Sequence, residues 1–300
     1  MERVHYDEFA YFQDNATEVG IEWRGQPIVR REFIPVDNQR KLSALVWGDD
    51  EPEFVFLHGG AQNAHTWDTV ALALNRPLVA IDLPGHGHSD GGAQGALNVQ
   101  RNAEDIATVI QQLAPRAHIV VGMSLGGATS IALVDHAPEL VTRLALVDIT
   151  PGVEGSKTQH IADFINGPET FPSFDELLAR TIEFNPTRSE SSLRRGILHN
   201  ALQLDDGTWV WRYRRLAEPG DVHPDFTSLW DVVGNSTMPL LLARGTTAQS
   251  VVGDEDEAEL RKRRPDALVV HVEGAGHSIQ GDKPVELAQL LDSFRRDQLA

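Results

Sequence analysis

The sequence contains no cysteine, which excludes disulfides, zinc–thiolate sites and a thiol nucleophile. It also has no apolar run long enough for a transmembrane helix. Its N-terminal segment carries acidic side chains where a signal peptide needs a basic region followed by an apolar run. We therefore expect a cytoplasmic protein that does not enter a membrane.

Basic residues are scarce as well. The 26 lysines and arginines stand against 44 aspartates and glutamates, which gives a formal net charge of −18. Such a surface repels polyanions, so the composition argues against nucleic acid or an anionic membrane as a partner. The length of 300 residues suits one large α/β domain with an insertion, or two small domains.

The most informative stretch is IVVGMSLGG at residues 119–127. A β-branched run ends in the pattern G-x-S-x-G, and apolar residues at helical spacing follow at once. This order matches a nucleophile elbow, in which a buried strand turns sharply at a serine and a helix carries the chain away. The pentapeptide alone is weak evidence in a chain with 25 glycines, but its context favours Ser124 as a nucleophile.

Strands and helices alternate on both sides of this stretch. Strands are expected at residues 29–35, 41–47, 53–57, 78–81, 119–123, 143–148, 239–243 and 268–272. Helices are expected at residues 7–19, 64–74, 97–113, 125–137, 254–264 and 283–294. The first two strands are joined by a turn and predict an antiparallel hairpin. The rest of the alternation predicts a parallel sheet with helices on both faces.

The alternation breaks between residues 151 and 236. Helical segments at 175–183 and 191–202 and an aromatic stretch at 209–213 occur there, without a buried strand of the parallel type. We therefore predict a first part of the core at residues 1–150, including an N-terminal extension. A mainly helical cap insertion at 151–236 and a second part of the core at 237–300 follow it.

A serine nucleophile needs a base, and His277 is the best placed of the 12 histidines. It lies in a glycine-rich turn just after the last expected strand, where catalytic groups of parallel sheets gather. His271 lies within that strand and is expected to be structural, while His58 is expected to hydrogen-bond its own turn. His86 and His88 lack the third ligand that a zinc site needs.

Together, HGG at 58–60, DLPGHGHS at 82–89, GMSLG at 122–126 and GH at 276–277 resemble the α/β-hydrolase superfamily. The resemblance covers residues 28–150 and 237–298, and it implies a mostly parallel eight-stranded sheet with a cap at the insertion. FPSF at 171–174 and DGTWVWRY at 206–213 are similar to actinobacterial cytosolic carboxylesterases. The resemblance thus implies a serine hydrolase that cleaves carboxylic esters without a cofactor or a metal.

The position of the triad acid departs from the common pattern of the superfamily. Members often carry it a few residues after the strand that ends here near Gly245, but GTTAQS at 245–250 contains no carboxylate. Asp148 ends the strand after the elbow strand, and adjacent strands lie only about 4.8 Å apart. We therefore favour Asp148, with a carboxylate near Asp254 as the alternative and Asp82 as a turn residue.

The expected mechanism is acyl transfer. His277 takes the proton of Ser124 as the serine attacks an ester carbonyl, and water later hydrolyses the acyl-enzyme. The backbone N–H groups of Gly60 and Leu125 are the expected oxyanion donors. The aromatic side chains of the cap either line an apolar acyl pocket or form the core of the cap itself. These are Phe171, Phe174, Trp209, Trp211 and Tyr213.

Two alternatives remain open at this point. A hydrolase of the carbon–carbon bond in ring-cleavage-type diketo acids uses a similar set of residues. A non-catalytic ligand-binding homologue would explain the missing carboxylate after Gly245. A small ester of short to medium acyl length is the expected substrate, and the sequence does not indicate the oligomeric state.

Overall fold

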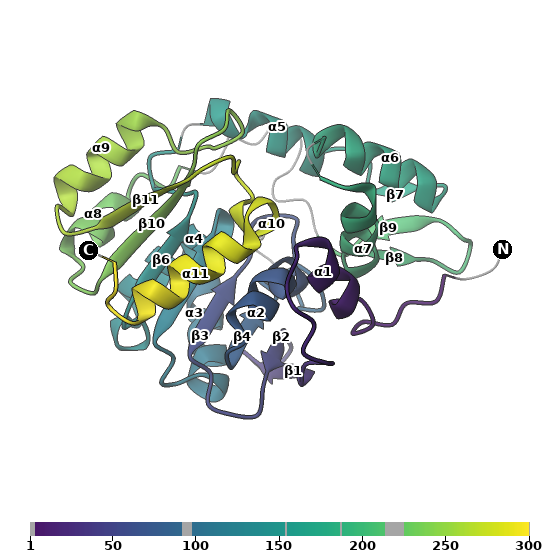
Figure 1. Ribbon diagram of the computed structural model, residues 1–300, viewed down its shortest axis with the longest axis horizontal. Coiled ribbons are helices and arrows are strands. Elements are labelled where there is room, and N and C mark those ends of the chain that lie inside the picture. Colours follow the sequence, from purple (N-terminus) through teal and green to yellow (C-terminus); the bar gives the residue numbers. More distant parts are fainter. Residues whose placement is uncertain (1–3, 92–97, 154, 187, 214–224, 300) are drawn as a thin grey trace.

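The computed structural model describes residues 4–91, 98–153, 155–186, 188–213 and 225–299. Its main sheet has eight strands in the order β1-β2-β4-β3-β5-β6-β10-β11 (Figure 1). They are β1 (Val29–Pro35), β2 (Lys41–Trp47), β3 (Phe54–Leu57), β4 (Leu78–Ile81), β5 (Ile119–Met123), β6 (Leu144–Val147), β10 (Leu240–Gly245) and β11 (Leu268–Val272). The pairs β1–β2 and β2–β4 are antiparallel, and all other neighbours are parallel. The predicted hairpin and mostly parallel sheet are confirmed.

Helices cover both faces of this sheet. They are α1 (Phe12–Glu18), the 3-10 helix η1 (Ala64–Trp67), α2 (Asp68–Leu74), α3 (Val99–Leu113), α4 (Leu125–His136), the 3-10 helix η2 (Pro138–Leu140), α8 (Leu229–Asn235), α9 (Asp254–Arg263), α10 (Ile279–Asp282) and α11 (Pro284–Arg295). The expected helices are present, whereas α8 and α10 were not anticipated. Both are single short segments, too short for a periodic pattern to stand out.

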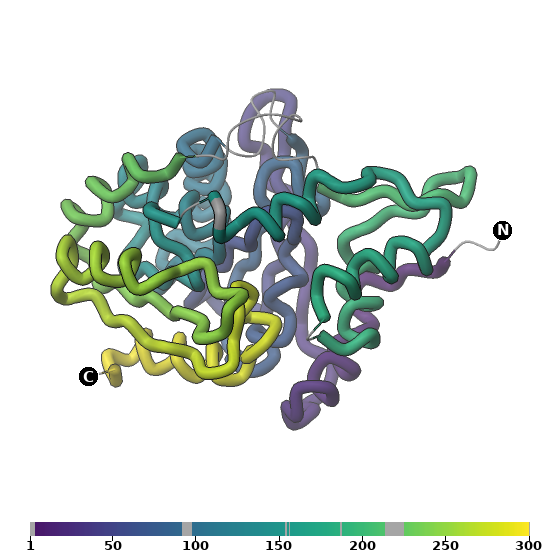
Figure 2. Tube along the Cα trace, turned by 90° about the horizontal axis from the view of Figure 1, so that it is seen from above, coloured from purple at the N-terminus to yellow at the C-terminus, as the bar shows by residue number. Residues whose placement is uncertain are grey.

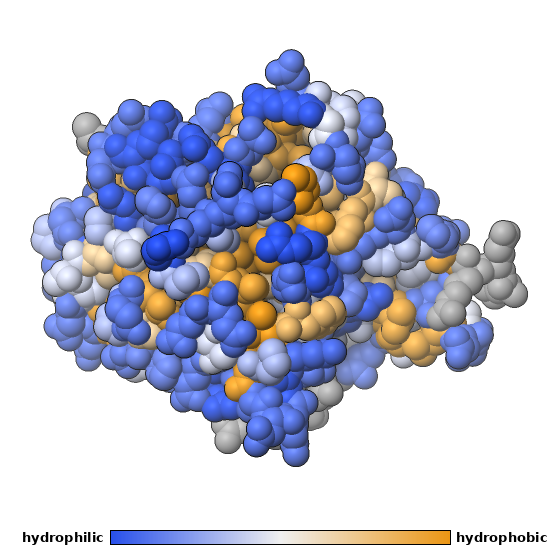
Figure 3. Space-filling model, turned by 90° about the horizontal axis from the view of Figure 1, so that it is seen from below, coloured by the Kyte–Doolittle hydropathy of each residue, from blue (hydrophilic) through white to orange (hydrophobic). Residues whose placement is uncertain are grey.

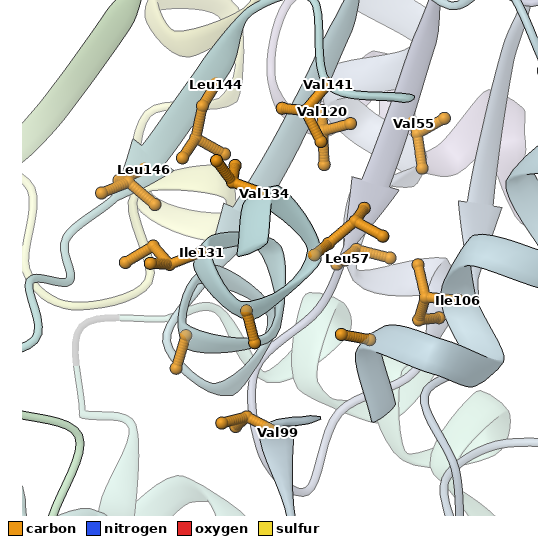
Figure 4. Packing of buried hydrophobic residues seen from close by; sticks show 14 of the residues in the cluster. Val55, Leu57, Val99, Ile106, Val120, Ile131, Val134, Val141, Leu144 and Leu146 are labelled. Carbon is orange, nitrogen blue, oxygen red and sulfur yellow. The ribbon is translucent and has the colours of Figure 1, made fainter. Parts of the chain in front are cut away.

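Two hydrophobic clusters form the core, one on each face. Side chains alternate along a strand, so Val55 and Leu57 of β3 face α3, α4, α8 and α9. Phe54 and Phe56 of the same strand face α1, α2 and α11 instead. Figure 4 shows the first cluster, in which side chains of β3, β5 and β6 meet those of α3 and α4. Burial on both faces explains why these strands are continuous apolar runs in the sequence.

The insertion after β6 forms a separate cap layer (Figure 2). Among its described residues, this layer consists of three helices and a small antiparallel sheet with strand order β7-β9-β8. The elements are α5 (Gly155–Ile165), β7 (Thr170–Phe171), α6 (Phe174–Phe184), α7 (Glu190–Asn200), β8 (Ala201–Gln203) and β9 (Trp209–Trp211). The small sheet and α5 were not anticipated, and the aromatic stretch is part of β9. Helix α8 falls within residues 151–236 but packs on α4 in the core.

The N-terminal segment joins the core to the cap. Helix α1 packs on α2, and Figures 1 and 2 both show it beside α7 of the cap. Arg195 of α7 donates to Asn15 Oδ1 at 2.7 Å and forms an ion pair with Glu18. Further along, the Val4 N–H donates to Gln203 Oε1 in β8 at 2.9 Å. The segment therefore restrains the cap from the side of α7.

The surface is mostly polar on the face that Figure 3 shows. Figure 3 shows polar side chains over most of one face, with apolar side chains gathered toward its middle. Within the described residues, no helix is long and apolar enough to cross a membrane.

Helix α4 begins in close contact with β3, because Gly126 leaves no side chain between them. A Cβ atom on Gly126 would lie 2.6 Å from His58 O and would collide with Leu57 O. Both are backbone atoms, which cannot rotate away. By contrast, a Cβ atom on Gly196 in α7 would have nothing within 4 Å.

We predict opposite effects of alanine at these two helical glycines. Gly126→Ala should lower the free energy of unfolding by about 1–3 kcal/mol, the usual cost of overpacking. Gly196→Ala should raise it by about 0.5–1 kcal/mol through better helix propensity. Urea unfolding of both variants checks this. Equal effects of the two substitutions would contradict the close contact at Gly126.

Candidate active site

Ser124 lies in the sharp turn between β5 and α4. Its backbone has φ 51° and ψ −118°, a conformation that residues other than glycine rarely adopt. The turn is tight enough that a Cβ atom on Gly122 would lie 2.5 Å from Gly126 O. The expected strand, turn and helix are thus all present. Ser124 is partly exposed and lines a cavity of about 280 Å³ between the core and the cap.

Asp148 follows the neighbouring strand β6 and is fully buried. Its Oδ1 accepts hydrogen bonds from Gly245 N at 2.9 Å and from Ser250 Oγ at 2.6 Å, and its Oδ2 accepts one from Val251 N at 2.9 Å. Burial on its own raises the pKa of Asp148. Hydrogen bonds from His277 and these donors outweigh it and leave the pKa below its usual value. Asp148 is therefore a stable carboxylate.

His277 lies in the loop after β11 and contacts that carboxylate. Its Nδ1 is 3.0 Å from Asp148 Oδ2, and its side chain is only 11% exposed. Its Nε2 is buried and has no hydrogen-bond partner among the described residues. His277 and Ser124 line the same cavity. Such contacts are often long in a free enzyme and shorten when substrate binds, so the geometry leaves Nε2 available to the serine.

The alternative acid lies elsewhere. Asp254 is the first residue of α9, its side chain is 96% exposed, and it accepts a hydrogen bond from Arg244 at 2.7 Å. The structure therefore brings Asp148 to His277 and leaves Asp254 at the surface, while the nearby Asp256 is paired with Lys157.

Gly60 lies in the loop after β3, beside the serine turn. A Cβ atom on the adjacent Gly59 would lie 3.3 Å from Ser124 Cβ. The loop is held by Gln62 Oε1, which accepts from Gly59 N at 3.1 Å, and by His86 Nε2, which accepts from Ala61 N at 3.1 Å. Burial lowers the pKa of His86 to about 3, so its ring is neutral and can accept this bond.

His58 links the same loop to the segment after β4. Its Nδ1 lies 2.7 Å from Gly59 O, as expected for a residue that bonds its own turn, and its Nε2 accepts from Leu83 N at 2.9 Å. The roles of His58 and His86 as acceptors of backbone N–H groups were missed in the sequence. Their two motifs, HGG and DLPGHGHS, lie at the ends of the paired strands β3 and β4, which is the signal that links them.

Comparison with known proteins agrees with this geometry. A family model described as "Alpha/beta hydrolase family" matches residues 54–290. The chain belongs to the α/β-hydrolase family. It is 43% identical over 292 residues to esterase Rv0045c of Mycobacterium tuberculosis, covering 95% of this chain and 94% of that protein. A solved structure of that esterase has a TM-score of 0.87 at 42% identity, and covers 97% of this chain and 99% of the other.

More distant relatives carry other names. The chain is 27% identical to the mouse (Mus musculus) sn-1-specific diacylglycerol lipase ABHD11, over 81% of this chain and 80% of the lipase. It is also 27% identical to 2-(acetamidomethylene)succinate hydrolase of Mesorhizobium japonicum, over 81% of this chain and 87% of that enzyme.

Helix α5 contributes an apolar part of the wall of the hydrolase cavity. Ile161, Phe164 and Ile165 line the cavity together with Trp211 of β9. Their spacing along the chain, with apolar side chains at i, i+3 and i+4, is typical of one helix face and could have revealed them. Of the five aromatic residues expected from the sequence to bind substrate, Trp211 is the one that lines this cavity.

The other four aromatic residues have packing roles. Phe171 and Trp209 are buried in the core of the cap, and Phe174 packs against that core. Tyr213 is buried with Ala61 and Ile165. Phe171, Phe174 and Trp209 thus match the other expectation, the core of the cap itself, because the small cap sheet needs its own apolar core. Tyr213 packs instead against two residues of the cavity wall. A role of these four side chains in substrate binding stays a prediction.

A network of buried charges joins the N-terminal segment to the core. Asp82, expected to be a turn residue, accepts from Arg31 Nη1 at 2.8 Å, Ala64 N at 2.7 Å and His88 N at 3.0 Å. Arg31 also forms an ion pair with Glu8. Asp82 is therefore the buried partner of a cation as well as a turn residue, because the first hairpin brings Arg31 onto it.

His65, Asp68 and His199 form a group among the described residues that could hold a metal ion, with ligand atoms within 4.8 Å of one another. His65 Nδ1 lies 2.9 Å from Asp68 Oδ2, and its Nε2 lies 3.0 Å from Glu8 Oε1. Burial lowers the pKa of His65, but Asp68 and Glu8 outweigh it and raise the pKa to about 9. Both ring nitrogens of His65 therefore carry a proton at neutral pH, and a metal ion would have to displace one of these protons to bind there.

We predict that protonation of His65 contributes to stability in a pH-dependent way. The pKa of His65 is about 9 in the folded chain and about 6.5 in an unfolded chain. The stabilisation is then complete below about pH 6.5 and is lost as the pH rises through about 9. The difference in free energy of unfolding between the unaltered chain and His65→Gln should shrink from pH 6 to pH 10. Other titrations are shared by both proteins, so a constant difference would contradict the assignment.

Proposed function

We propose that this protein hydrolyses carboxylic esters through Ser124, His277 and Asp148. The observation that carries the proposal is the 3.0 Å contact between His277 Nδ1 and Asp148 Oδ2, next to a serine held in a strained turn. The 43% identity to a mycobacterial esterase over nearly the whole chain supports the same activity.

Asp148 sets the tautomer of His277. Its carboxylate accepts the Nδ1–H group, which leaves Nε2 without a proton and able to act as a base. Nε2 removes the proton of Ser124 as the serine oxygen attacks the ester carbonyl, and it then protonates the departing alcohol. A water molecule repeats the same steps on the acyl-enzyme. The buried carboxylate stabilises the imidazolium that forms each time.

The backbone stabilises the oxyanion of each tetrahedral intermediate. The donors are the N–H groups of Leu125, the first residue of α4, and of Gly60 in the loop beside it. His86 and Gln62 fix that loop before substrate arrives, so no reorganisation is needed during the reaction. One such donor typically contributes about 2.7–4 kcal/mol to transition-state stability.

The cavity suits a small ester with a short to medium acyl chain. Its volume is about 280 Å³, and Ile161, Phe164 and Trp211 give it an apolar wall.

The expected cytoplasmic location and the absence of nucleic acid and membrane partners stay predictions.

The two alternative functions lead to different experimental results. A carbon–carbon hydrolase would cleave a vinylogous diketo acid and leave simple esters intact. A ligand receptor would bind without turnover. The receptor hypothesis depended on the missing carboxylate after β10, and the contact between Asp148 and His277 favours catalysis instead.

We predict the rates of p-nitrophenyl ester hydrolysis for three variants of this chain. Ser124→Ala should lower kcat by about 10⁵- to 10⁶-fold and Asp148→Asn by about 10⁴-fold, as in other serine hydrolases. Asp254→Asn, at the exposed ion pair with Arg244, should change the rate by less than about twofold. Circular dichroism checks that each variant is folded. Loss of activity in Asp254→Asn together with full activity in Asp148→Asn would contradict the assigned acid.

A further inference from the structure

Arg188, between α6 and α7, contributes a cationic side chain to the same cavity. It lines the cavity together with Ser124, His277 and the apolar face of α5. Its guanidinium donates one hydrogen bond, from Nη2 to Ser192 Oγ at 2.7 Å. Among the described residues, no carboxylate lies within ion-pair distance of it.

Arg195 provides an internal comparison, because it lines the cavity too. Its Nε donates to Asn15 Oδ1, its Nη1 donates to Ser191 Oγ, and it forms an ion pair with Glu18. All three of its nitrogens therefore have partners in the protein. Among the described residues, Ser192 is the hydrogen-bond partner of the Arg188 side chain, so most of its N–H donors are unused although the side chain is partly buried.

An unpaired guanidinium in a largely buried position costs free energy. Burial lowers the pKa of Arg188, even though Asp282 and Glu18 attract the charge from beyond ion-pair distance. A cation kept in this state next to a catalytic serine is typical of a site that is completed by an anionic ligand.

The guanidinium of Arg188 packs against α10. A Cβ atom on Gly281 would lie 2.9 Å from Arg188 Cζ and would collide with Nη1. The guanidinium therefore lies directly against the backbone of α10, which starts immediately after His277 and Ser278. The guanidinium, His277 and the apolar side chains of α5 all line the same cavity.

We propose that Arg188 binds a carboxylate carried by the substrate, so that the preferred esters have an apolar segment and a carboxylate end. The planar guanidinium with unused donors fits a carboxylate through two parallel hydrogen bonds. The inference rests on the proposed ester hydrolysis. It assigns the substrate class: esters of small carboxylate-bearing molecules, with the carboxylate in the acyl part or in the alcohol part.

The test compares matched neutral and anionic esters. For the acyl side, p-nitrophenyl valerate is compared with p-nitrophenyl hydrogen glutarate. For the alcohol side, phenyl butyrate is compared with 4-(butyryloxy)benzoate. The variants are Arg188→Met, which removes the charge, and Arg188→Lys, which keeps it. Arg194→Met is the matched control, because Arg194 lies on α7 in an exposed ion pair with Glu190.

The unaltered enzyme should prefer the anionic member of at least one pair. Arg188→Met should raise KM and lower kcat/KM for that ester by about 10- to 100-fold, the range expected for a charge-assisted hydrogen bond. Hydrolysis of the neutral ester should change by less than about threefold, and this also reports correct folding. Arg188→Lys should retain part of the preference, and Arg194→Met all of it. Equal losses on both esters, or no preference in the unaltered enzyme, would overturn the proposal.

A binding measurement separates this proposal from the catalytic one. Calorimetry with monomethyl glutarate should detect binding to Ser124→Ala and none to Ser124→Ala combined with Arg188→Met. If no ester is hydrolysed but this difference in binding is observed, the proposed function fails and the carboxylate site stands. If esters are hydrolysed and Ser124→Ala binds no carboxylate, the carboxylate site fails and the proposed function stands.

Discussion

The site depends on the hydrogen bonds that the buried carboxylate of Asp148 accepts. It accepts four hydrogen bonds, from Gly245, Ser250, Val251 and His277. Asp148 precedes the cap in the sequence, and all four donors follow it. The carboxylate therefore has its hydrogen-bond donors only when the part of the core that follows the cap in the sequence packs against the part that precedes it. A buried charge without these partners would be costly, so the same contacts that orient His277 also favour this arrangement of the chain.

The loop after β10 donates hydrogen bonds to Asp148 and contains no carboxylate of its own between Gly245 and Ser250. Many members of the superfamily carry the acid there, whereas this chain places Ser250 and Val251 in that loop as donors to Asp148. In the proposed triad the acid follows β6 instead, and the loop after β10 donates hydrogen bonds to it. Because β6 lies between β5 and β10 in the sheet, the carboxylate still lies close to the ends of both strands. His277 can therefore contact Asp148 and still line the same cavity as Ser124.

The sequence was informative where a local pattern decides the structure. The strands from β1 to β6 are recognisable because each is a compact apolar or alternating run, and Asp148 was found because β5 and β6 are sequential neighbours. Contacts between distant segments leave no such pattern. Nothing near Asp82 indicates Arg31, and nothing near Arg188 indicates Gly281. The sequence left the role of the cap aromatics open for the same reason, since only the pairing of β7 with β9 places Phe171 in the core of the cap.

The N-terminal segment has a consequence for how substrates are admitted. Asn15 lines the cavity, and the helix that carries it is bonded to α7 of the cap through Arg195. Tyr6 adds a hydrogen bond to His199 at 2.8 Å, on the same helix. One side of the cap is thus fastened to the beginning of the chain, while the described contacts of that segment do not include α5. The two sides of the cavity are therefore held by different parts of the chain, α7 by the N-terminal segment and α5 by the ion pair of Lys157 with Asp256 in α9, so widening of the cavity at α7 would have to break contacts with the beginning of the chain.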